Sequence, residues 1–193
     1  MALYIKRFLD IFFSICALIF LSPVLVLISI KTMLSSKGGI FYLQQRIGYN
    51  EQPFTIYKFR SMYFDAEKDG PALSSIQDKR ITPWGRTMRK WRLDELPQLW
   101  NILIGDMSLV GPRPERKNYI DQLIIQAPQY RELLKVKPGL TSWGMIRFGY
   151  ASSVEEMIER MQFDLLYIKQ ASLLLDFKIM LLTLKIILSG EGK

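Results

Sequence analysis

Residues 93–103 read LDELPQLWNIL and place two adjacent carboxylates, Asp94 and Glu95, directly before an apolar helical pattern. Leucine and tryptophan side chains recur there at the three- and four-residue spacing of one helix face. Pro97 fits only the first turn of that helix, where its missing N–H has no partner to lose. We therefore expect Asp94 near the N-cap, where backbone N–H groups and the helix dipole keep a carboxylate ionised and can also hold a phosphate. The simpler alternative is that Asp94 only caps the helix.

Basic residues precede these carboxylates. Thr82 and Pro83 predict the start of a helix, with Thr82 as its N-cap and Pro83 at its first position. Arg89 lies along this helix with other lysines and arginines on neighbouring turns, so a cationic surface leads to Asp94. A solvated helix face is the alternative, although such a face more usually mixes in acidic partners at helical spacing.

A rigid turn follows the apolar helix. Gly105 has the position of a C-cap glycine, and residues 110–114 read VGPRP. Pro112 and Pro114 fix the backbone on either side of Arg113, so its guanidinium loses less entropy when it grips a phosphate with two hydrogen bonds. A solvent-exposed turn is the alternative.

Two runs rich in aromatic and β-branched residues, 40–48 and 54–62, predict a β-hairpin. Lys58 and Arg60 fall two residues apart on the second strand and should point to the same face, where they can bind phosphate or simply face solvent. Residues 63–80 contain few apolar side chains and are predicted to form a mobile loop, which is either a lid over a site or a plain disordered insertion.

Composition limits the possible functions. The 193 residues carry 26 lysines and arginines against 18 acidic residues, so the net charge of +8 favours anionic partners. There is no histidine, and the single cysteine, Cys16, excludes disulfides and multi-cysteine metal sites within one chain. Acid–base and nucleophilic chemistry therefore falls to carboxylates, lysines or tyrosines.

Residues 11–30 contain no charged side chain and are long enough to cross a bilayer. We do not expect a cleaved signal peptide, because the run is too long and no small-residue cleavage site follows it. Ser22 and Pro23 lie inside the run and predict a sharp kink. Basic residues flank both ends, so the usual charge asymmetry is missing. A bent helix that enters the membrane and returns explains both features, and a kinked spanning helix is the alternative.

The C-terminal part is predicted to be helical. Residues 117–136 read as helix interrupted near Pro128, and another helix starts at Ser153 and includes Asp164. Residues 173–188 form a mostly apolar segment with charges that argue against spanning. This segment is either a core helix or an amphipathic helix at the membrane surface.

Four motifs together resemble the bacterial sugar transferase family, the monotopic phosphoglycosyl transferases. They are SP at 22–23, YKFRSM at 57–62, LDELPQL at 93–99 and GDMSLVGPRP at 105–114. The resemblance covers nearly the whole chain, and the length is similar to the small form of the family, which lacks the extra transmembrane helices of larger relatives.

The resemblance implies an α+β, mostly helical fold. Residues 1–36 would form a re-entrant membrane helix broken at Ser22-Pro23, and residues 37–193 a compact cytosolic catalytic domain with interfacial amphipathic helices. The protein would then be monotopic, on the cytosolic face of the bacterial inner membrane and in contact with membrane lipid.

The same resemblance implies transfer of a sugar 1-phosphate from a UDP-sugar to undecaprenyl (polyprenol) phosphate, as the first membrane step of glycoconjugate assembly. Asp94 would be the nucleophile and form a covalent phosphosugar intermediate with help from Mg²⁺, for which Asp94 is the candidate ligand. Glu95 would handle the proton or orient the lipid phosphate. Further residues expected near the nucleotide, phosphate or metal are Lys58, Arg60, Arg89, Pro112, Arg113, Pro114 and Asp164.

The chemistry of the residues agrees with this expectation, because a carboxylate that attacks phosphorus gives a reactive acyl phosphate suited to a two-step transfer. Direct attack by the lipid phosphate is an alternative mechanism. A membrane adaptor that binds anionic lipid without catalysis is an alternative function. No nucleic-acid partner is expected, since no recognised motif is present and the membrane segment argues against one. No sugar and no oligomeric state are predicted.

Overall fold

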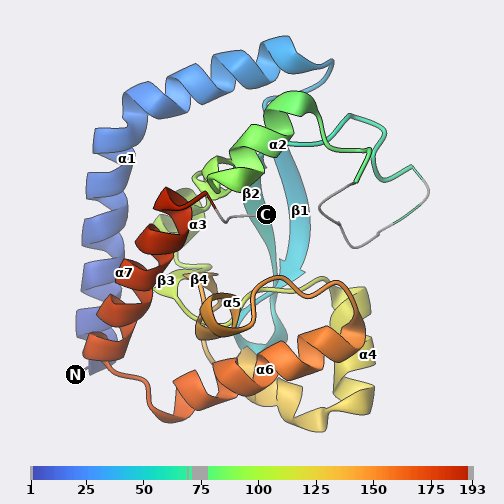
Figure 1. Cartoon of the computed structure of the whole chain (residues 1–193). Coiled ribbons are helices and arrows are strands. Elements are labelled where there is room, and N and C mark those ends of the chain that lie inside the picture. The colour runs from blue at the N-terminus through green and yellow to red at the C-terminus, as the bar shows by residue number, and fades with distance from the viewer. Residues whose placement is uncertain (1, 69, 71–77, 191–193) are drawn as a thin grey trace.

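A computed structural model of the chain describes residues 2–68, 70 and 78–190 (Figure 1). Helices predominate over strands there, so the predicted mostly helical α+β class is confirmed. The regular elements are α1 (Ala2–Ser35), β1 (Phe41–Ile47), β2 (Pro53–Phe59), α2 (Pro83–Lys90), α3 (Gln98–Ile104), β3 (Ser108–Val110), α4 (Lys117–Gln126), β4 (Gly139–Thr141), α5 (Trp143–Arg147), α6 (Val154–Lys169) and α7 (Leu173–Leu188). Short 3₁₀ segments cover Tyr49–Glu51, Leu93–Glu95 and Pro128–Lys135.

The N-terminal helix α1 is long, apolar and bent. Within the described residues, one helical stretch, Tyr4–Ser35, is long and apolar enough to cross a membrane. Figure 1 shows α1 running beside α7, bending sharply and then crossing toward α2. Pro23 lies inside the helix, and the Ser22 hydroxyl donates to the carbonyl of Ile19 at 2.8 Å. A kink is the expected effect of a proline that removes one backbone hydrogen bond.

The first arm of α1 is attached to the body of the protein by polar contacts. Arg7 donates to the carbonyls of Ile102 and Leu103, at 2.5 and 2.8 Å, at the C-terminal end of α3. Asp10 is buried and accepts a hydrogen bond from the Leu109 backbone N–H at 3.0 Å. The Arg7 contacts satisfy carbonyls in the last turn of α3, and the Asp10 contact attaches α1 to β3.

The second arm of α1, beyond the bend, is attached as well. Ile28 is buried and packs in a cluster with Phe59 of β2 and Met88 of α2. Thr32 is also buried, and its hydroxyl accepts a 3.2 Å hydrogen bond from the Trp84 indole N–H. Both arms therefore contact the same body.

Strands β1 and β2 form the predicted antiparallel hairpin, with Phe41 opposite Phe59 and Tyr42 opposite Lys58. One edge of β2 is held by Asn101 of α3. The Asn101 side chain accepts from the Tyr57 N–H at 3.0 Å and donates to the Thr55 carbonyl at 2.7 Å. The hairpin is thereby fixed against the helix that follows the two carboxylates.

The second sheet is a short parallel pair, β3 and β4, in which Ser108 lies opposite Gly139 and Val110 opposite Thr141. Their backbones approach so closely that a Cβ on Gly139 would lie 2.1 Å from the Gly111 nitrogen. A side chain there would force the strands apart, so glycine is required. Strand β3 leads directly into the Gly111–Pro114 turn.

The C-terminal helices follow the predicted pattern. Helix α4 ends at Gln126 and a 3₁₀ segment starts at Pro128, where the interruption was expected. Ser153 caps α6 by accepting from the Glu156 N–H at 3.2 Å. Helix α7 buries Ile179 completely and exposes 77% of Leu188. One face of α7 thus belongs to the core, and the membrane-surface role of its other face stays a prediction.

The predicted loop at 63–80 is described in part. Residues 69 and 71–77 lie outside the described residues. Residues 64–68 form turns, and an isolated bridge joins Met62 to Ile81.

Candidate active site

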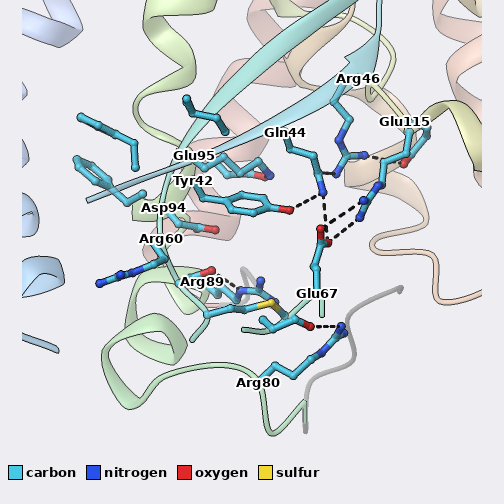
Figure 2. A pocket seen from close by; sticks show the side chains of 18 of the residues that line it. Tyr42, Gln44, Arg46, Arg60, Glu67, Arg80, Arg89, Asp94, Glu95 and Glu115 are labelled. Carbon is cyan, nitrogen blue, oxygen red and sulfur yellow. Dashed lines mark hydrogen bonds and ion pairs between the residues drawn. The ribbon is translucent and has the colours of Figure 1, made fainter. Parts of the chain in front are cut away.

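A cavity of about 480 Å³ lies between the hairpin, the two carboxylates and the start of α4 (Figure 2). Its described lining contains eight cationic and four acidic side chains. The cationic residues are Arg46, Lys58, Arg60, Arg80, Arg89, Arg113, Arg116 and Arg160. The acidic residues are Glu67, Asp94, Glu95 and Glu115. Such an excess of positive charge suits a polyanionic ligand.

The backbone before α3 turns Asp94 and Glu95 into this cavity. Arg92 adopts a left-handed conformation with φ of 51°, and Leu93–Glu95 follows as one 3₁₀ turn. Helix α3 begins at Gln98 with Pro97 as its N-cap, and there is no side-chain capping bond. Asp94 was expected near the N-cap, with a purely capping role as the alternative. The capping role is wrong, because Pro97 is the N-cap and Asp94 lies one turn earlier in the 3₁₀ segment rather than in the extended backbone that capping needs.

Glu95 is the electrostatic centre of the site. Its side chain, 7% exposed, contacts Lys58 Nζ at 2.9 Å, Arg113 Nη2 at 3.4 Å and Arg92 Nη1 at 3.9 Å. Burial raises the pKa of Glu95, but the charges of Lys58, Arg113 and Arg92 outweigh burial and bring this pKa below its usual range. Glu95 is therefore an anion that keeps three cations in place.

Asp94 has the opposite environment. It is buried, and burial together with the adjacent Glu95 charge raises the pKa of Asp94, against the opposing effects of Lys58 and Arg89. The expectation that a helix dipole keeps Asp94 ionised is corrected accordingly. A buried carboxylate with an elevated pKa is a stronger base and nucleophile when ionised, and it favours an additional cation nearby.

A metal at this site would have few protein ligands. In the part of the chain that is described, no group of three His, Cys, Asp or Glu side chains could hold a metal ion. Mg²⁺, however, is usually held by one or two carboxylates together with substrate phosphates and water. The Asp94 carboxylate thus fits an ion that arrives with a nucleotide diphosphate.

Several residues predicted for the site line the cavity: Asp94, Glu95, Lys58, Arg60, Arg89 and Arg113. Arg89 donates from Nε to the Ser61 hydroxyl at 2.9 Å. Arg60 differs from its expected use. Its Nη groups donate to the carbonyls of Thr32, Ser36 and Lys37 at the end of α1. The Nη donors that could have bound phosphate therefore hold the C-terminal end of α1 and the two residues that follow it.

The predicted residues Pro112, Pro114 and Asp164 do not line the cavity. The two prolines act through their carbonyls, since Pro112 accepts from the Gly139 N–H at 2.9 Å and Pro114 accepts from Arg46 Nη1 at 3.1 Å. These bonds hold the turn that presents Arg113.

Asp164 lies beneath α5, away from the cavity. It is buried and accepts a 2.8 Å hydrogen bond from the Gly144 N–H. Burial raises the pKa of Asp164 to about 6, although the Gly144 N–H and Arg160 oppose that shift. Direct contact of Asp164 with substrate is not supported by this position. Arg160, one helical turn earlier on α6, is the residue that reaches the cavity.

Sequence reasoning missed several lining residues. Tyr150 follows α5, and its ring lies 5.4 Å from the Arg92 guanidinium carbon and 5.3 Å from that of Arg113. Burial and the Glu95 charge raise the pKa of Tyr150 to about 12, so the phenol stays protonated. Nothing in the local sequence around Tyr150 signals this contact.

A second missed group carries charge. Glu115 bridges Arg46 at 3.2 Å and Arg160 at 2.6 Å, and Arg116 pairs with Glu67 at 2.7 Å. Glu115 and Arg116 directly follow the Pro-Arg-Pro turn. This position in the sequence is the one signal that could have predicted them as site residues.

Comparison with known proteins identifies the relatives of this chain. The family model described as bacterial sugar transferase matches residues 1–190. A UDP-N-acetylgalactosamine-undecaprenyl-phosphate N-acetylgalactosaminephosphotransferase of Aeromonas hydrophila is 39% identical over 189 residues, which cover 98% of this chain and 45% of the relative. UDP-glucose:undecaprenyl-phosphate glucose-1-phosphate transferases of Escherichia coli and Caulobacter vibrioides are 39% and 38% identical; the matches cover 93% and 97% of this chain and 39% and 71% of those relatives.

This chain spans less than half the length of the Aeromonas hydrophila and Escherichia coli relatives. The family match nevertheless extends over nearly all of its residues and includes both carboxylates and the Pro-Arg-Pro turn. The chain therefore belongs to the bacterial sugar transferase family.

Proposed function

We propose that this protein transfers a sugar 1-phosphate from a UDP-sugar to undecaprenyl phosphate, giving a polyprenyl diphosphosugar and UMP. One observation carries the proposal: Asp94, buried and with a raised pKa, lines a cationic cavity whose residue Arg60 also bonds to the long apolar helix α1. The printed names of the relatives, which include N-acetylgalactosamine and glucose phosphate transferases acting with undecaprenyl phosphate, support the substrate classes.

The reaction proceeds in two displacements at one phosphorus atom. An Asp94 oxygen attacks the phosphorus that is bonded to the sugar oxygen, the bond from that phosphorus to the UMP oxygen breaks, and UMP leaves with the electron pair. An oxygen of undecaprenyl phosphate then attacks the same phosphorus, and the Asp94 carboxylate is released. The bond between the sugar and its oxygen is not broken, so the anomeric configuration is retained.

The cations of the site have separate tasks. Arg113, held by the Gly111–Pro114 turn and beside the Tyr150 ring, is placed to stabilise charge on the equatorial phosphate oxygens. Lys58 and Arg89 oppose the rise in the pKa of Asp94 and favour its ionised, nucleophilic form. Glu95 keeps Lys58 and Arg113 in place. Mg²⁺ held by Asp94 and the diphosphate would supply further positive charge to the phosphate oxygens.

The membrane arrangement is also a proposal. We assign residues 1–36 as a re-entrant anchor and residues 37–193 as one catalytic unit on the cytosolic face of the bacterial inner membrane, with α7 as an interfacial helix. The contacts of Arg7 and Asp10 before the bend, and of Ile28 and Thr32 after it, support this topology. Because both arms contact the same body, both ends of α1 can lie on the same side of a bilayer, as a re-entrant helix requires.

A UMP-release assay tests the function. The full chain in lipid nanodiscs is given undecaprenyl phosphate, Mg²⁺ and a panel of UDP-sugars, with Asp94→Asn as the control. We expect multiple-turnover UMP release with at least one UDP-sugar, dependent on the lipid phosphate and abolished in the variant. A protein that only binds anionic lipid would give no lipid-dependent UMP release, and its membrane binding would not depend on the Asp94 charge.

A further inference from the structure

On the side of the cavity away from Asp94, a separate group of polar side chains surrounds the carboxylate of Glu67. The Glu67 carboxylate receives two bonds from Arg116, at 2.7 Å to Oε1 and 3.3 Å to Oε2, and a 3.5 Å bond from Gln44 Nε2. The same Gln44 nitrogen donates to the Tyr42 hydroxyl at 2.7 Å. Figure 2 shows Gln44 and Glu67 on one side of the cavity and Asp94 on the other.

The donors of this group are held rigidly. Arg46 Nη2 donates to the side-chain oxygen of Gln44, Oε1, at 2.6 Å. The side-chain NH₂ group of Gln44 must therefore point toward Tyr42 and Glu67. Arg46 is itself fixed by Glu115 and by the Pro114 carbonyl. The orientation of Gln44 is therefore linked to the same turn that presents Arg113.

The Glu67 carboxylate is the member of this group that can move away. The Glu67 side chain is 33% exposed, against 7% for Glu95 and 6% for Glu115. Glu67 belongs to the turn segment 64–68, whereas Gln44 is on β1 and Arg116 precedes α4. Within the pair, Glu67 is more exposed than Arg116, at 33% against 19%, so solvent reaches the pair from the Glu67 side and weakens it there. The two parallel N–H···O bonds that Arg116 makes to a carboxylate have the geometry it would use for phosphate.

The chemistry of the proposed reaction requires an anion subsite in this region. A phosphoryl group is displaced in line, so the leaving UMP must lie across the phosphorus from the attacking Asp94. We propose that Arg116, Gln44 and Tyr42 form a subsite for the phosphate of the leaving nucleotide, and that Glu67 occupies this subsite until the nucleotide displaces it. This inference rests on the proposed function, since it assigns one substrate group to a part of the same cavity.

The test is direct binding of UMP to the full chain in nanodiscs, measured by calorimetry without lipid phosphate. Arg116→Gln should raise the Kd for UMP at least tenfold, because a charge-assisted bidentate contact is lost. Glu67→Gln should lower the Kd about two- to fivefold, because it weakens the internal competitor. Lys117→Gln is the matched control. It removes the same charge one residue away, from a side chain that is 74% exposed and paired with Asp121, and should leave the Kd unchanged.

Opposite effects of Arg116→Gln and Glu67→Gln on UMP binding support the subsite. Unchanged Kd values in both variants overturn it, as does weaker UMP binding in Glu67→Gln, which would make Glu67 a nucleotide ligand. If Arg116→Gln instead raises the KM for undecaprenyl phosphate and leaves UMP binding intact, the anion is the lipid phosphate and the nucleotide assignment is wrong. Lipid-dependent UMP release by the wild-type chain separates these results from failure of the proposed function, because the release does not depend on which side chains hold UMP.

Discussion

Replacing Glu95 by Gln should lower the stability of the protein and, at the same time, lower the pKa of Asp94. Glu95 contacts Lys58, Arg113 and Arg92 within 2.9–3.9 Å, and all four side chains are less than a fifth exposed. Removing one partner of such a buried group leaves uncompensated charge, at a cost of about 3–5 kcal/mol. The amide oxygen can still accept hydrogen bonds, so we expect the lower end, about 3 kcal/mol.

The pH dependence of this loss has a definite sign. The pKa of Glu95 is lower in the folded than in the unfolded protein, so its contribution to the free energy of unfolding is present above about pH 4.5, the ordinary value. It is lost as the pH falls toward the folded-state pKa. The difference between wild type and Glu95→Gln should therefore be full at pH 7 and shrink below about pH 4.5.

Two assays measure the two effects. For a chain of this size, about 3 kcal/mol corresponds to a decrease of about 6–12 °C in the melting temperature, followed by tryptophan fluorescence in nanodiscs. The pH dependence of UMP release reports on Asp94, whose pKa is raised partly by the Glu95 charge. The acidic limb of the pH–rate profile should therefore move to lower pH in Glu95→Gln, even if kcat falls.

Glu132→Gln is the matched control for this variant. Glu132 pairs with Lys135 at 2.7 Å on the surface, with both side chains more than half exposed, so its loss should cost less than about 1 kcal/mol. Equal melting temperatures for the two variants, or an acidic limb that moves to higher pH in Glu95→Gln, would refute the reasoning.

Three further predictions concern single residues. Arg60→Met should lower the free energy of unfolding by about 2–3 kcal/mol, because the carbonyls of Thr32 in α1 and of Ser36 and Lys37 just after it lose their donor, while the Kd for UMP stays unchanged. Weaker UMP binding at an unchanged melting temperature would contradict this. Asp164→Asn should keep turnover, because its amide oxygen can accept from the Gly144 N–H. Asp164→Ala should lower the free energy of unfolding by about 1–3 kcal/mol, measured by thermal unfolding. A stable but inactive Asp164→Asn variant would instead indicate a direct role of Asp164 in the reaction. The kcat/KM for UMP release, which reports on the free enzyme, should fall on acidification at a pH above 3.8, the ordinary pKa of an aspartate, because Asp94 must be ionised to attack. A kcat/KM independent of pH down to that value would contradict the raised pKa.

Local patterns predicted the elements whose causes are local. The hairpin, the Thr82 cap, the helix start at Ser153 and the C-cap Gly105 at the end of α3 all follow from neighbouring residues in the sequence. The β3–β4 pair was not predicted, because each strand has three residues and the pairing joins Ser108 to Gly139 across distant parts of the chain. Strands of that length carry no periodic signal.

The site was predicted to a similar extent. The Asp94-Glu95 pair, Lys58 and Arg113 lie in motifs, Arg89 lies on the predicted basic helix before them, and all of them line the cavity. The distribution of their charges was not, because the raised pKa of Asp94 and the lowered pKa of Glu95 result from burial and from partners on other elements.

Residues outside the motifs needed the three-dimensional structure. Tyr150 and Glu67 reach the cavity only when α5 and the segment after β2 are folded against it. Arg60 is the opposite case. It lies inside a motif, but its guanidinium bonds to backbone carbonyls at the end of α1 rather than being free for a ligand.

The most direct test of the account is to trap the covalent intermediate. The full chain in nanodiscs is mixed with the UDP-sugar that supports turnover, without undecaprenyl phosphate, and quenched for mass spectrometry of the peptide that contains Asp94. The account predicts one equivalent of UMP released per enzyme and a sugar phosphate adduct on Asp94 that disappears when undecaprenyl phosphate is added. The absence of both the adduct and the UMP burst, with sequential kinetics when both substrates are present, would contradict nucleophilic attack by Asp94.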